Sequence, residues 1–200
     1  MERWVVLDVE TSGLDARVDD LLAIAAMGLS VDWSSRTIQL SLRDSFEVFL
    51  RPDRTSDRAN VLLHGIGHEA QRSGLEPSLA LDRFLAFIGQ APLLAYHASF
   101  DQKVLERALK THKHLSLPNP WVDIEHLCSV SEQGVRAKSL DEWMLAVGVQ
   151  CLARHRAAAD TLAECELVMR IWPALSQQCR SWSDVKSLAK NRRWLGGGSH

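Results

Sequence analysis

The sequence lacks a long hydrophobic run and lacks the cysteine patterns of disulfide-rich or zinc-binding proteins. Its longest apolar stretch, residues 21–31, is too short to cross a bilayer. No signal peptide is expected, because the first residues read directly as a strand. No Cys-X-X-Cys pair and no histidine at zinc spacing accompanies the four cysteines, Cys128, Cys151, Cys165 and Cys179. These absences predict reduced thiols, a cytoplasmic location and no membrane contact.

An excess of charge of either sign is also absent. The 200 residues carry 23 Lys and Arg against 25 Asp and Glu, a formal net charge of −2. Nucleic acid could therefore bind only through local basic patches or through metal ions. No internal repeat or low-complexity segment interrupts the chain, whose length suits one domain. Residues 196–200, Gly-Gly-Gly-Ser-His, are typical of a linker and the start of an affinity tag.

The stretch around which the chain is organised is a predicted strand over residues 3–10, read RWVVLDVE. Its apolar residues suit a strand buried on both faces, and Asp8 and Glu10 end the apolar run. Positions two apart in a strand point to the same side, so the two carboxylates project together. A cation between them would offset their repulsion, and Mg²⁺ prefers oxygen ligands. Taken alone, the pair is equally compatible with a turn at Asp8 and a solvated strand end at Glu10.

Hydrophobic periodicity and turn residues predict the remaining elements. Further strands are expected over residues 21–29, 37–50, 93–96 and 121–124. Helices are expected over residues 59–63, 77–88, 100–110, 140–147, 156–172 and 181–194. Ser99 is the expected N-cap of the third helix, and Pro173 follows the end of the fifth. Three strands followed by alternating helices and strands predict an α/β fold with a five-stranded mixed sheet flanked by helices.

Three separated segments together resemble the motifs of one enzyme family. The residues Asp8-Val9-Glu10-Thr11-Ser12-Gly13-Leu14 resemble the first motif of the DEDDh 3′–5′ exonucleases. This is the family of the DNA polymerase III epsilon subunit, RNase T and oligoribonuclease. His97-Ala98-Ser99-Phe100-Asp101 resembles the second motif, and the stretch from His155 to Asp160 resembles the third. The resemblance implies a ribonuclease H-like fold, with residues 1–173 as the exonuclease domain and residues 174–195 as a helical extension packed on it.

The resemblance also implies two Mg²⁺ or Mn²⁺ ions as cofactors. Asp8, Glu10 and Asp160 would hold the first ion, Asp8 would bridge to the second, and Asp101 would support the second. His155 would accept the proton of the attacking water, because imidazole titrates near neutrality. Simpler interpretations exist for single residues: Asp101 could favour a helix N-terminus, Asp160 could be a solvated helix residue, and His155 could be a surface residue of a basic loop.

Candidate substrate contacts flank the same motifs. The turn after the first strand offers backbone donors, and the resemblance implies that Leu14 wedges against the terminal base. A His-Gly-Ile stretch beginning at His64 borders the terminal nucleotide in the family. Phe100 could stack on a base or belong to the core. The family usually has Asn where this chain has His97, which could alter substrate contacts. The full candidate set is Thr11, Ser12, Gly13, Leu14, His64, His97 and Phe100.

These observations predict a metal-dependent 3′–5′ exonuclease that releases nucleoside monophosphates from single-stranded nucleic acid, with DNA slightly favoured. An RNA-directed exoribonuclease is one alternative, and a non-catalytic nucleic-acid- or polymerase-binding module with the same fold is another. All five reactive positions are filled, which argues against a decayed site. The expected partners are 3′ ends of single-stranded DNA or RNA, and a DNA polymerase could be a further one. The sequence leaves the choice between DNA and RNA, and the oligomeric state, open.

Overall fold

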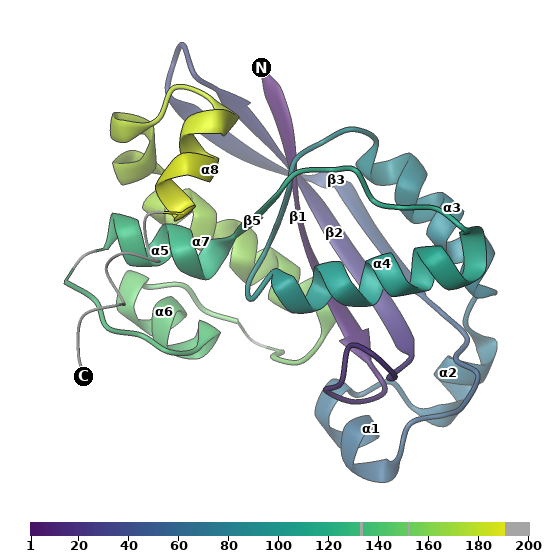
Figure 1. Ribbon diagram of the computed structural model, residues 1–200. Helices are drawn as coiled ribbons and strands as arrows, with labels where there is room; N and C mark the ends of the chain where they lie inside the picture. Colours follow the sequence, from purple (N-terminus) through teal and green to yellow (C-terminus); the bar gives the residue numbers. More distant parts are fainter. Residues whose placement is uncertain (133, 152, 191–200) are drawn as a thin grey trace, which may run out of the picture.

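The computed structural model describes residues 1–132, 134–151 and 153–190. Within them, five strands form one sheet in the order β3-β2-β1-β4-β5. The long strands β1 (Glu2–Thr11), β2 (Leu21–Asp32) and β3 (Thr37–Phe49) pair antiparallel. The short strands β4 (Leu93–Ala95) and β5 (Trp121–Asp123) run parallel to β1. The expected five-stranded mixed sheet is thus confirmed, with β1 at its centre (Figure 1).

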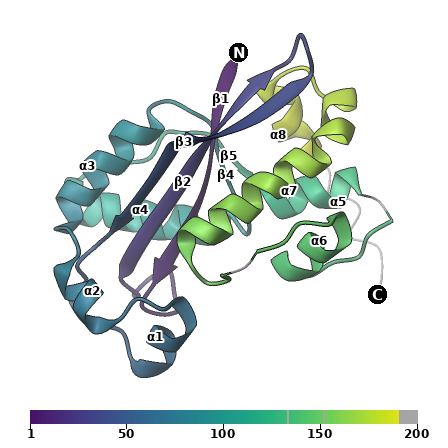
Figure 2. The same ribbon diagram turned by 180° about the vertical axis from the view of Figure 1, so that it is seen from behind.

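Helices cover both faces of the sheet (Figures 1 and 2). One face carries α3 (Pro77–Ile88) and α4 (Ser99–Lys113). The other face carries α5 (Ile124–Ser131), α6 (Leu140–Val147), α7 (Ala157–Gln178) and α8 (Trp182–Lys190). The short helices α1 (Arg58–His64) and α2 (His68–Ser73) lie near the end of the sheet at which β1 finishes.

The side chains of β1 alternate between two hydrophobic cores. Val5 packs into the core beneath α3 and α4, whereas Trp4 and Val6 pack into the core beneath α7. All three are fully buried, which accounts for the nearly continuous apolar run. Since side chains two apart share a face, Asp8 and Glu10 continue the row of Trp4 and Val6. The sheet therefore presents both carboxylates to α7.

Small residues of β2 let the start of α7 lie close to these carboxylates. In the antiparallel register, Ala25 pairs with Asp8 and Ala23 pairs with Glu10. Both alanines form a buried cluster with Ala157, the first residue of α7. Larger side chains at these strand positions would hold the helix away from the sheet. The short side chains thus bring the first turn of α7 against the end of β1.

Four tryptophans pack together at the opposite end of β1. The ring centroid of Trp4 lies 5.8 Å from that of Trp33, 5.8 Å from that of Trp172 and 4.9 Å from that of Trp182. Tilted and edge-to-face contacts of this kind add to the gain from burial. They join β1 to the turn after β2, to α7 and to α8.

The structure corrects two predicted helix ends. Ser99 is the first residue of α4 and not its N-cap, a position that Ala98 occupies without a side-chain hydrogen bond. Helix α7 does not end before Pro173 but continues to its end at residue 178. Proline removes one backbone donor, yet Leu175 and Ser176 beyond it are buried. Packing of these last turns outweighs the missing hydrogen bond, so the predicted domain boundary after residue 173 falls inside the helix.

Two short helices, α2 and α5, lie outside the predicted set. Helix α5 follows β5 directly, because Asp123 caps it by accepting a hydrogen bond from the backbone N–H of Glu125 at 2.9 Å. Ile124, Leu127 and Cys128 are buried at helical spacing, a signal that could have identified this helix.

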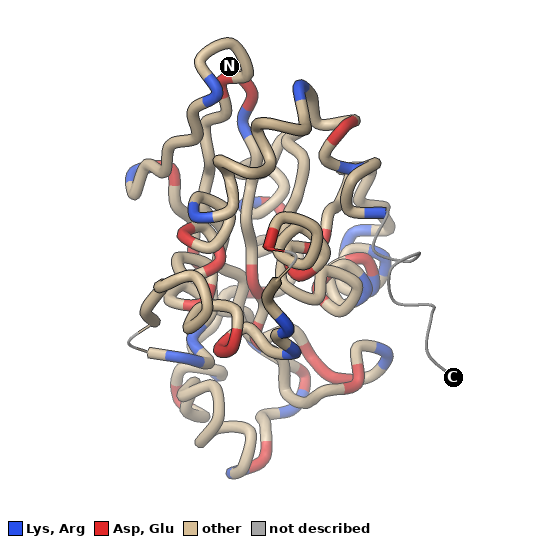
Figure 3. The backbone as a smooth tube through the Cα atoms, turned by 90° about the vertical axis from the view of Figure 1, so that its left-hand side faces the viewer, with Lys and Arg blue, Asp and Glu red and all other residues tan. Residues whose placement is uncertain are grey.

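The predicted last helix, over residues 181–194, corresponds to α8, whose Val185 and Ala189 are buried in the α7-side core. Residues 191–200, with the expected linker, lie outside the described residues. In the described part of the chain, no helix has the length and apolarity of a membrane span. Acidic and basic residues are interspersed over the described chain, in keeping with its small net charge (Figure 3).

Candidate active site

A cavity of about 480 Å³ opens where β1 and β4 finish. Ligands of α/β sheets commonly bind at this carboxyl end of the parallel strands. The cavity wall is formed by the end of β1, the residues after β4, the start of α4 and the start of α7. It brings together the five predicted catalytic residues, Asp8, Glu10, Asp101, His155 and Asp160. Among the predicted substrate contacts, it includes Thr11, Leu14, His97 and Phe100.

Three of the carboxylates converge. Asp8, Glu10 and Asp160 each offer an oxygen, and these oxygens all lie within 4.8 Å of one another. Asp8 and Glu10 are half-buried at the end of β1, whereas Asp160 is buried in the first turn of α7. Carboxylate oxygens at this spacing are suitable ligands for a hard divalent cation.

Asp101 reaches the same strand from the opposite helix layer. It lies in the first turn of α4, is 4% exposed, and accepts a hydrogen bond from the backbone N–H of Val9 at 3.2 Å. Val9 stands between Asp8 and Glu10, so this hydrogen bond ties α4 to the acidic end of β1. Asp101 lines the same cavity but is outside the group of three.

Burial and mutual repulsion raise the pKa values of these carboxyls. Burial, followed by the charges of neighbouring carboxylates, raises the pKa of Asp8 well above its usual range. Burial and then the charge of Asp160 raise the pKa of Glu10 to about 7. Burial raises the pKa of Asp101 to about 8. In the metal-free protein these carboxyls therefore retain protons near neutral pH, and a bound cation could replace the protons.

The raised pKa values predict how stability depends on pH in the metal-free protein. Between its ordinary and its raised pKa, such a carboxyl binds more protons in the folded chain than in the unfolded one. The free energy of unfolding should therefore fall as pH rises from about 5 to about 8, the window set by Glu10 and Asp101. Urea unfolding of chelator-treated protein, followed by tryptophan fluorescence, measures this change.

One histidine opposes this trend. Burial lowers the pKa of His64, so its contribution to stability increases as pH rises through its unfolded pKa. The variant Asp101→Asn removes one of the raised carboxyls and should show a weaker pH dependence than the unmodified chain. A free energy of unfolding that rises steadily across the window would contradict the prediction.

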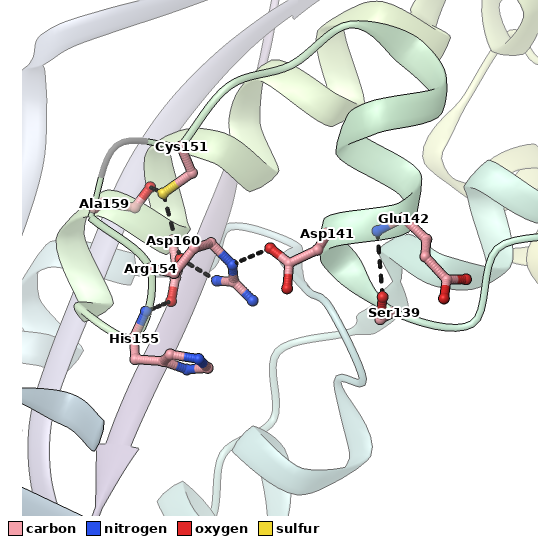
Figure 4. Close-up of polar contacts among 8 residues, drawn as sticks. All are labelled: Ser139, Asp141, Glu142, Cys151, Arg154, His155, Ala159 and Asp160. Carbon is pink, nitrogen blue, oxygen red and sulfur yellow. Dashed lines mark hydrogen bonds and ion pairs between the residues drawn. The ribbon is translucent and has the colours of Figure 1, made fainter. Parts of the chain in front are cut away.

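The segment before α7 is tied to Asp160 (Figure 4). The backbone N–H of His155 donates to Asp160 Oδ2 at 2.8 Å, and Arg154 Nη1 donates to Asp160 Oδ1. His155 has a φ of 61°, a left-handed conformation that residues other than glycine seldom adopt. Figure 4 shows that the backbone nitrogen makes this contact, which leaves the exposed imidazole at the cavity wall.

In the turn after β1, some residues line the cavity and others only stabilise the turn. Thr11 and Leu14 line the cavity, and Leu14 is 86% exposed. Ser12 and Gly13 lie outside the lining. Ser12 Oγ accepts a backbone N–H across the turn at 2.8 Å, and a Cβ on Gly13 would lie 2.5 Å from the Asp19 carboxylate. Ser12 and Gly13 therefore build the turn that presents the other two residues.

His64 lies in an adjoining cavity of about 250 Å³ that shares Glu10 with the first. Its side chain is buried, and its Nδ1 accepts the backbone N–H of Ile66 at 3.0 Å. The neutral ring must then carry its proton on Nε2, for which the described residues provide no hydrogen-bond partner. A buried donor without a partner is unfavourable, so this nitrogen is suited to an acceptor on a ligand.

His97 stands where the resemblance leads one to expect asparagine. Its φ is 57°, a conformation that asparagine adopts more readily than most residues. Its backbone N–H donates to Asp123 Oδ1 at 3.2 Å, and its Nε2 lies 3.5 Å from Glu125 Oε2. The imidazole packs on Tyr96, with 4.4 Å between ring centroids. Phe100 lines the cavity and also packs against the α4-side core, so its core interpretation is confirmed and its stacking on a base stays a prediction.

Sequence reasoning missed several residues of the cavity lining, among them the charged residues Glu164 and Arg154. Glu164 lies one turn after Asp160, is 1% exposed, and accepts the backbone N–H of Tyr96 at 3.3 Å. The spacing of four residues from Asp160 was the available signal. Arg154 links Asp160 to Asp141 of α6. No sequence signal identifies that link, because it depends on how α6 packs beside α7.

The sheet order and the acidic residues at the end of its central strand agree with the ribonuclease H-like fold that the resemblance implies. Comparison with known proteins agrees with this class. The RNase T model, described as an exonuclease, matches residues 5–168. The chain belongs to this exonuclease family, which confirms the resemblance to the DEDDh enzymes.

The chain is similar to known proteins of very different length. The chain is 27% identical over 167 residues to the PolC-type DNA polymerase III of Thermotoga maritima, a match that covers 84% of this chain and 12% of the relative. The chain thus spans a small part of that protein. Exonuclease I of E. coli in complex with a dT13 oligonucleotide has a TM-score of 0.68 and 19% identity, covering 94% of this chain and 46% of that chain. Exonuclease X in complex with 5′ overhanging duplex DNA has a TM-score of 0.69 and 19% identity, covering 94% and 99%. These two structures share the fold.

Proposed function

We propose that this chain is a metal-dependent 3′–5′ exonuclease that removes nucleoside monophosphates from single-stranded nucleic acid, with DNA as the preferred substrate. The observation that carries the proposal is the convergence of Asp8, Glu10 and Asp160, together with Asp101 and His155, in one cavity. These residues come from separate elements, and a purely structural role for each would not require them to meet.

The donor set fits Mg²⁺ or Mn²⁺, because every candidate ligand is a carboxylate oxygen. Asp8, Glu10 and Asp160 would hold one cation, and Asp8 with Asp101 would support a second. Such cations, when bound, stabilise charge on the phosphate and lower the pKa of a water molecule. The carboxyls contribute by exchanging protons for cations, since burial keeps the pKa of Glu10 and of Asp101 high in the metal-free protein.

His155 is the proposed general base. Its imidazole is exposed at the cavity wall, so it can accept a proton from the attacking water and pass it to solvent. The contact of its backbone with Asp160 couples the position of the base to that of a ligand. Asp101 has a comparable effect through Val9, because its hydrogen bond to the Val9 backbone N–H holds the strand from which Asp8 and Glu10 project.

The two adjoining cavities would share the terminal nucleotide. Leu14 and Phe100 would offer apolar surface for the base and sugar, and His64 in the second cavity would offer its unpartnered Nε2–H to an acceptor on the nucleotide. The turn formed by Ser12 and Gly13 holds Leu14 at the entrance.

DNA is favoured as the substrate because the structures of similar fold named above hold DNA. A DNA polymerase is a proposed partner, since the relative from Thermotoga is a polymerase that contains this domain. The free thiols of the chain support the cytoplasm as its compartment.

Digestion of 5′-labelled single-stranded DNA with Mg²⁺ or Mn²⁺ tests the proposal. A ladder that shortens from the 3′ end is expected. Internal fragments that appear first, with the 3′ end intact, would indicate an endonuclease. Matched RNA and duplex substrates in the same assay decide the substrate class: faster shortening of RNA would replace the DNA assignment with an exoribonuclease. No cleavage, together with no carboxylate-dependent binding of divalent cations, would favour a non-catalytic binding module.

A further inference from the structure

Arg154 joins two acidic residues of different helices (Figure 4). Its Nη1 contacts Asp160 Oδ1 in the first turn of α7, and its Nε donates to Asp141 Oδ1 in the first turn of α6 at 2.6 Å. The side chain of Asp160 is 6% exposed and that of Asp141 is 63% exposed. A single guanidinium thus connects a carboxylate of the cavity with a carboxylate near the surface.

Both oxygens of Asp160 are engaged by residues that precede α7. Oδ2 accepts the backbone N–H of His155, and Oδ1 faces Arg154 and lies 3.6 Å from Cys151 Sγ. Burial raises the pKa of the Cys151 thiol, which therefore stays protonated and can donate. Of these three donors, Arg154 is the one that carries a positive charge. A cation that binds Asp160 must share the carboxylate with it or displace it.

The same positive charge acts on a second carboxylate. Arg154 lowers the pKa of Glu10, against the larger opposite effect of burial, and it lines the cavity beside Glu10. Asp141 draws the guanidinium the other way, toward α6. The guanidinium of Arg154 therefore interacts both with the acidic cluster and with Asp141, an exposed partner outside the cavity.

We propose that Arg154 is the resident counter-ion of Asp160: it positions that carboxylate in the metal-free protein and competes with a divalent cation for it. This inference rests on the proposed function, which makes Asp160 a cation ligand. Arg154 acts through Asp160 and is a positioning residue. Asp141 weakens the competition, because an ion pair at one side of the guanidinium reduces its hold on the other.

Calorimetric titration of Mg²⁺ into the chelator-treated full chain tests this competition. Arg154→Met should bind Mg²⁺ about fivefold more tightly than the unmodified chain, the effect of one partly exposed neighbouring charge. Its metal-free form should melt at a lower temperature, because Asp160 loses its charged partner. Arg154→Gln, which removes the charge but retains amide donors, should also bind more tightly and is less prone to misfold.

Asp141→Asn, a substitution at an exposed position, should change the Mg²⁺ affinity in the opposite direction. It should bind Mg²⁺ about twofold more weakly, because Arg154 is then free to pair with Asp160 alone. The matched control is Arg3→Met, which removes the same charge from the pair between Arg3 and Asp44 at the far end of β1 and should leave Mg²⁺ affinity unchanged.

The outcomes separate this inference from the proposed function. Tighter binding by both Arg154 variants, with weaker binding by Asp141→Asn, supports competition. Equal or weaker Mg²⁺ binding by the Arg154 variants overturns the inference. If Arg154 only held Asp160 in position for the cation, its removal would lower the Mg²⁺ affinity. If the unmodified chain shows no Mg²⁺ binding that Asp8→Asn abolishes, the proposed function fails and this inference fails with it.

Discussion

Asp8→Asn is expected to lower kcat for exonucleolytic cleavage by roughly a thousandfold or more, because it removes a ligand that both cations would share. The pKa of Asp8 is raised most by burial. The charges of neighbouring carboxylates raise it further, in decreasing order of effect Glu164, Asp101, Glu10 and Asp160. Asparagine has nearly the same shape but carries no charge, and its amide nitrogen donates where a carboxylate oxygen would accept. The substitution therefore removes a charged ligand with little change in volume, and a single-turnover assay on labelled DNA measures the effect.

Stability measurements on the same variant show whether it loses cleavage because a ligand is missing or because the protein unfolds. Metal-free Asp8→Asn should be at least as stable as the unmodified chain, because the substitution replaces a buried carboxyl, whose charged form is disfavoured by burial and by its acidic neighbours, with a neutral amide. Its Mg²⁺ titration should lose most of the binding signal. Asp44→Asn makes the same change away from the cavity, where Asp44 pairs with Arg3, and should retain cleavage. Unchanged cleavage by Asp8→Asn would exclude a carboxylate-bound metal from the reaction.

His155→Asn is expected to lower kcat by roughly 10²–10⁴-fold, the usual contribution of a general base, with little change in Mg²⁺ affinity. Asparagine tolerates the left-handed backbone at this position, where φ is 61°, and it retains the N–H that donates to Asp160 Oδ2. The imidazole is then the part that is lost.

His114→Asn is the matched control for this substitution. His114 also has a left-handed backbone, with φ 55°, but it lies at the C-terminal cap of α4 and outside the cavity lining. This variant should cleave at the unmodified rate. Equal rates for the two variants would show that another group accepts the proton.

Local patterns in the sequence were sufficient for most of the sheet. The apolar run before Asp8 and the alternation in residues 37–50 depend on neighbours in the chain, and the corresponding strands form as expected. Helix α7 runs past Pro173 because its last turns are buried by contacts with distant elements, which a single-sequence pattern does not contain. Helix α5 was missed for a different reason: it follows β5 directly, and its first residue, Ile124, was included in the predicted strand over residues 121–124.

The site, like the sheet, could be predicted only where it depends on residues that are close together in the sequence. Asp8 and Glu10 were recognisable as a pair because a strand turns alternate residues to one side. The surroundings of Asp160 were not recognisable, because Arg154 and Asp141 meet only when α6 packs beside α7. The unpartnered Nε2 of His64 likewise depends on burial beneath elements distant in sequence. The catalytic, metal-binding and substrate-binding roles stay predictions that the variants described above test.

The acidic cavity draws on β1, on α4 and on the first turn of α7, so its parts are separated by most of the polypeptide. During synthesis, β1 leaves the ribosome long before Asp160 does, and proteins generally fold as whole domains. A growing chain therefore exposes isolated acids that cannot yet gather a cation. The acidic cavity would therefore be complete only when the first turn of α7 docks on the alanines of β2.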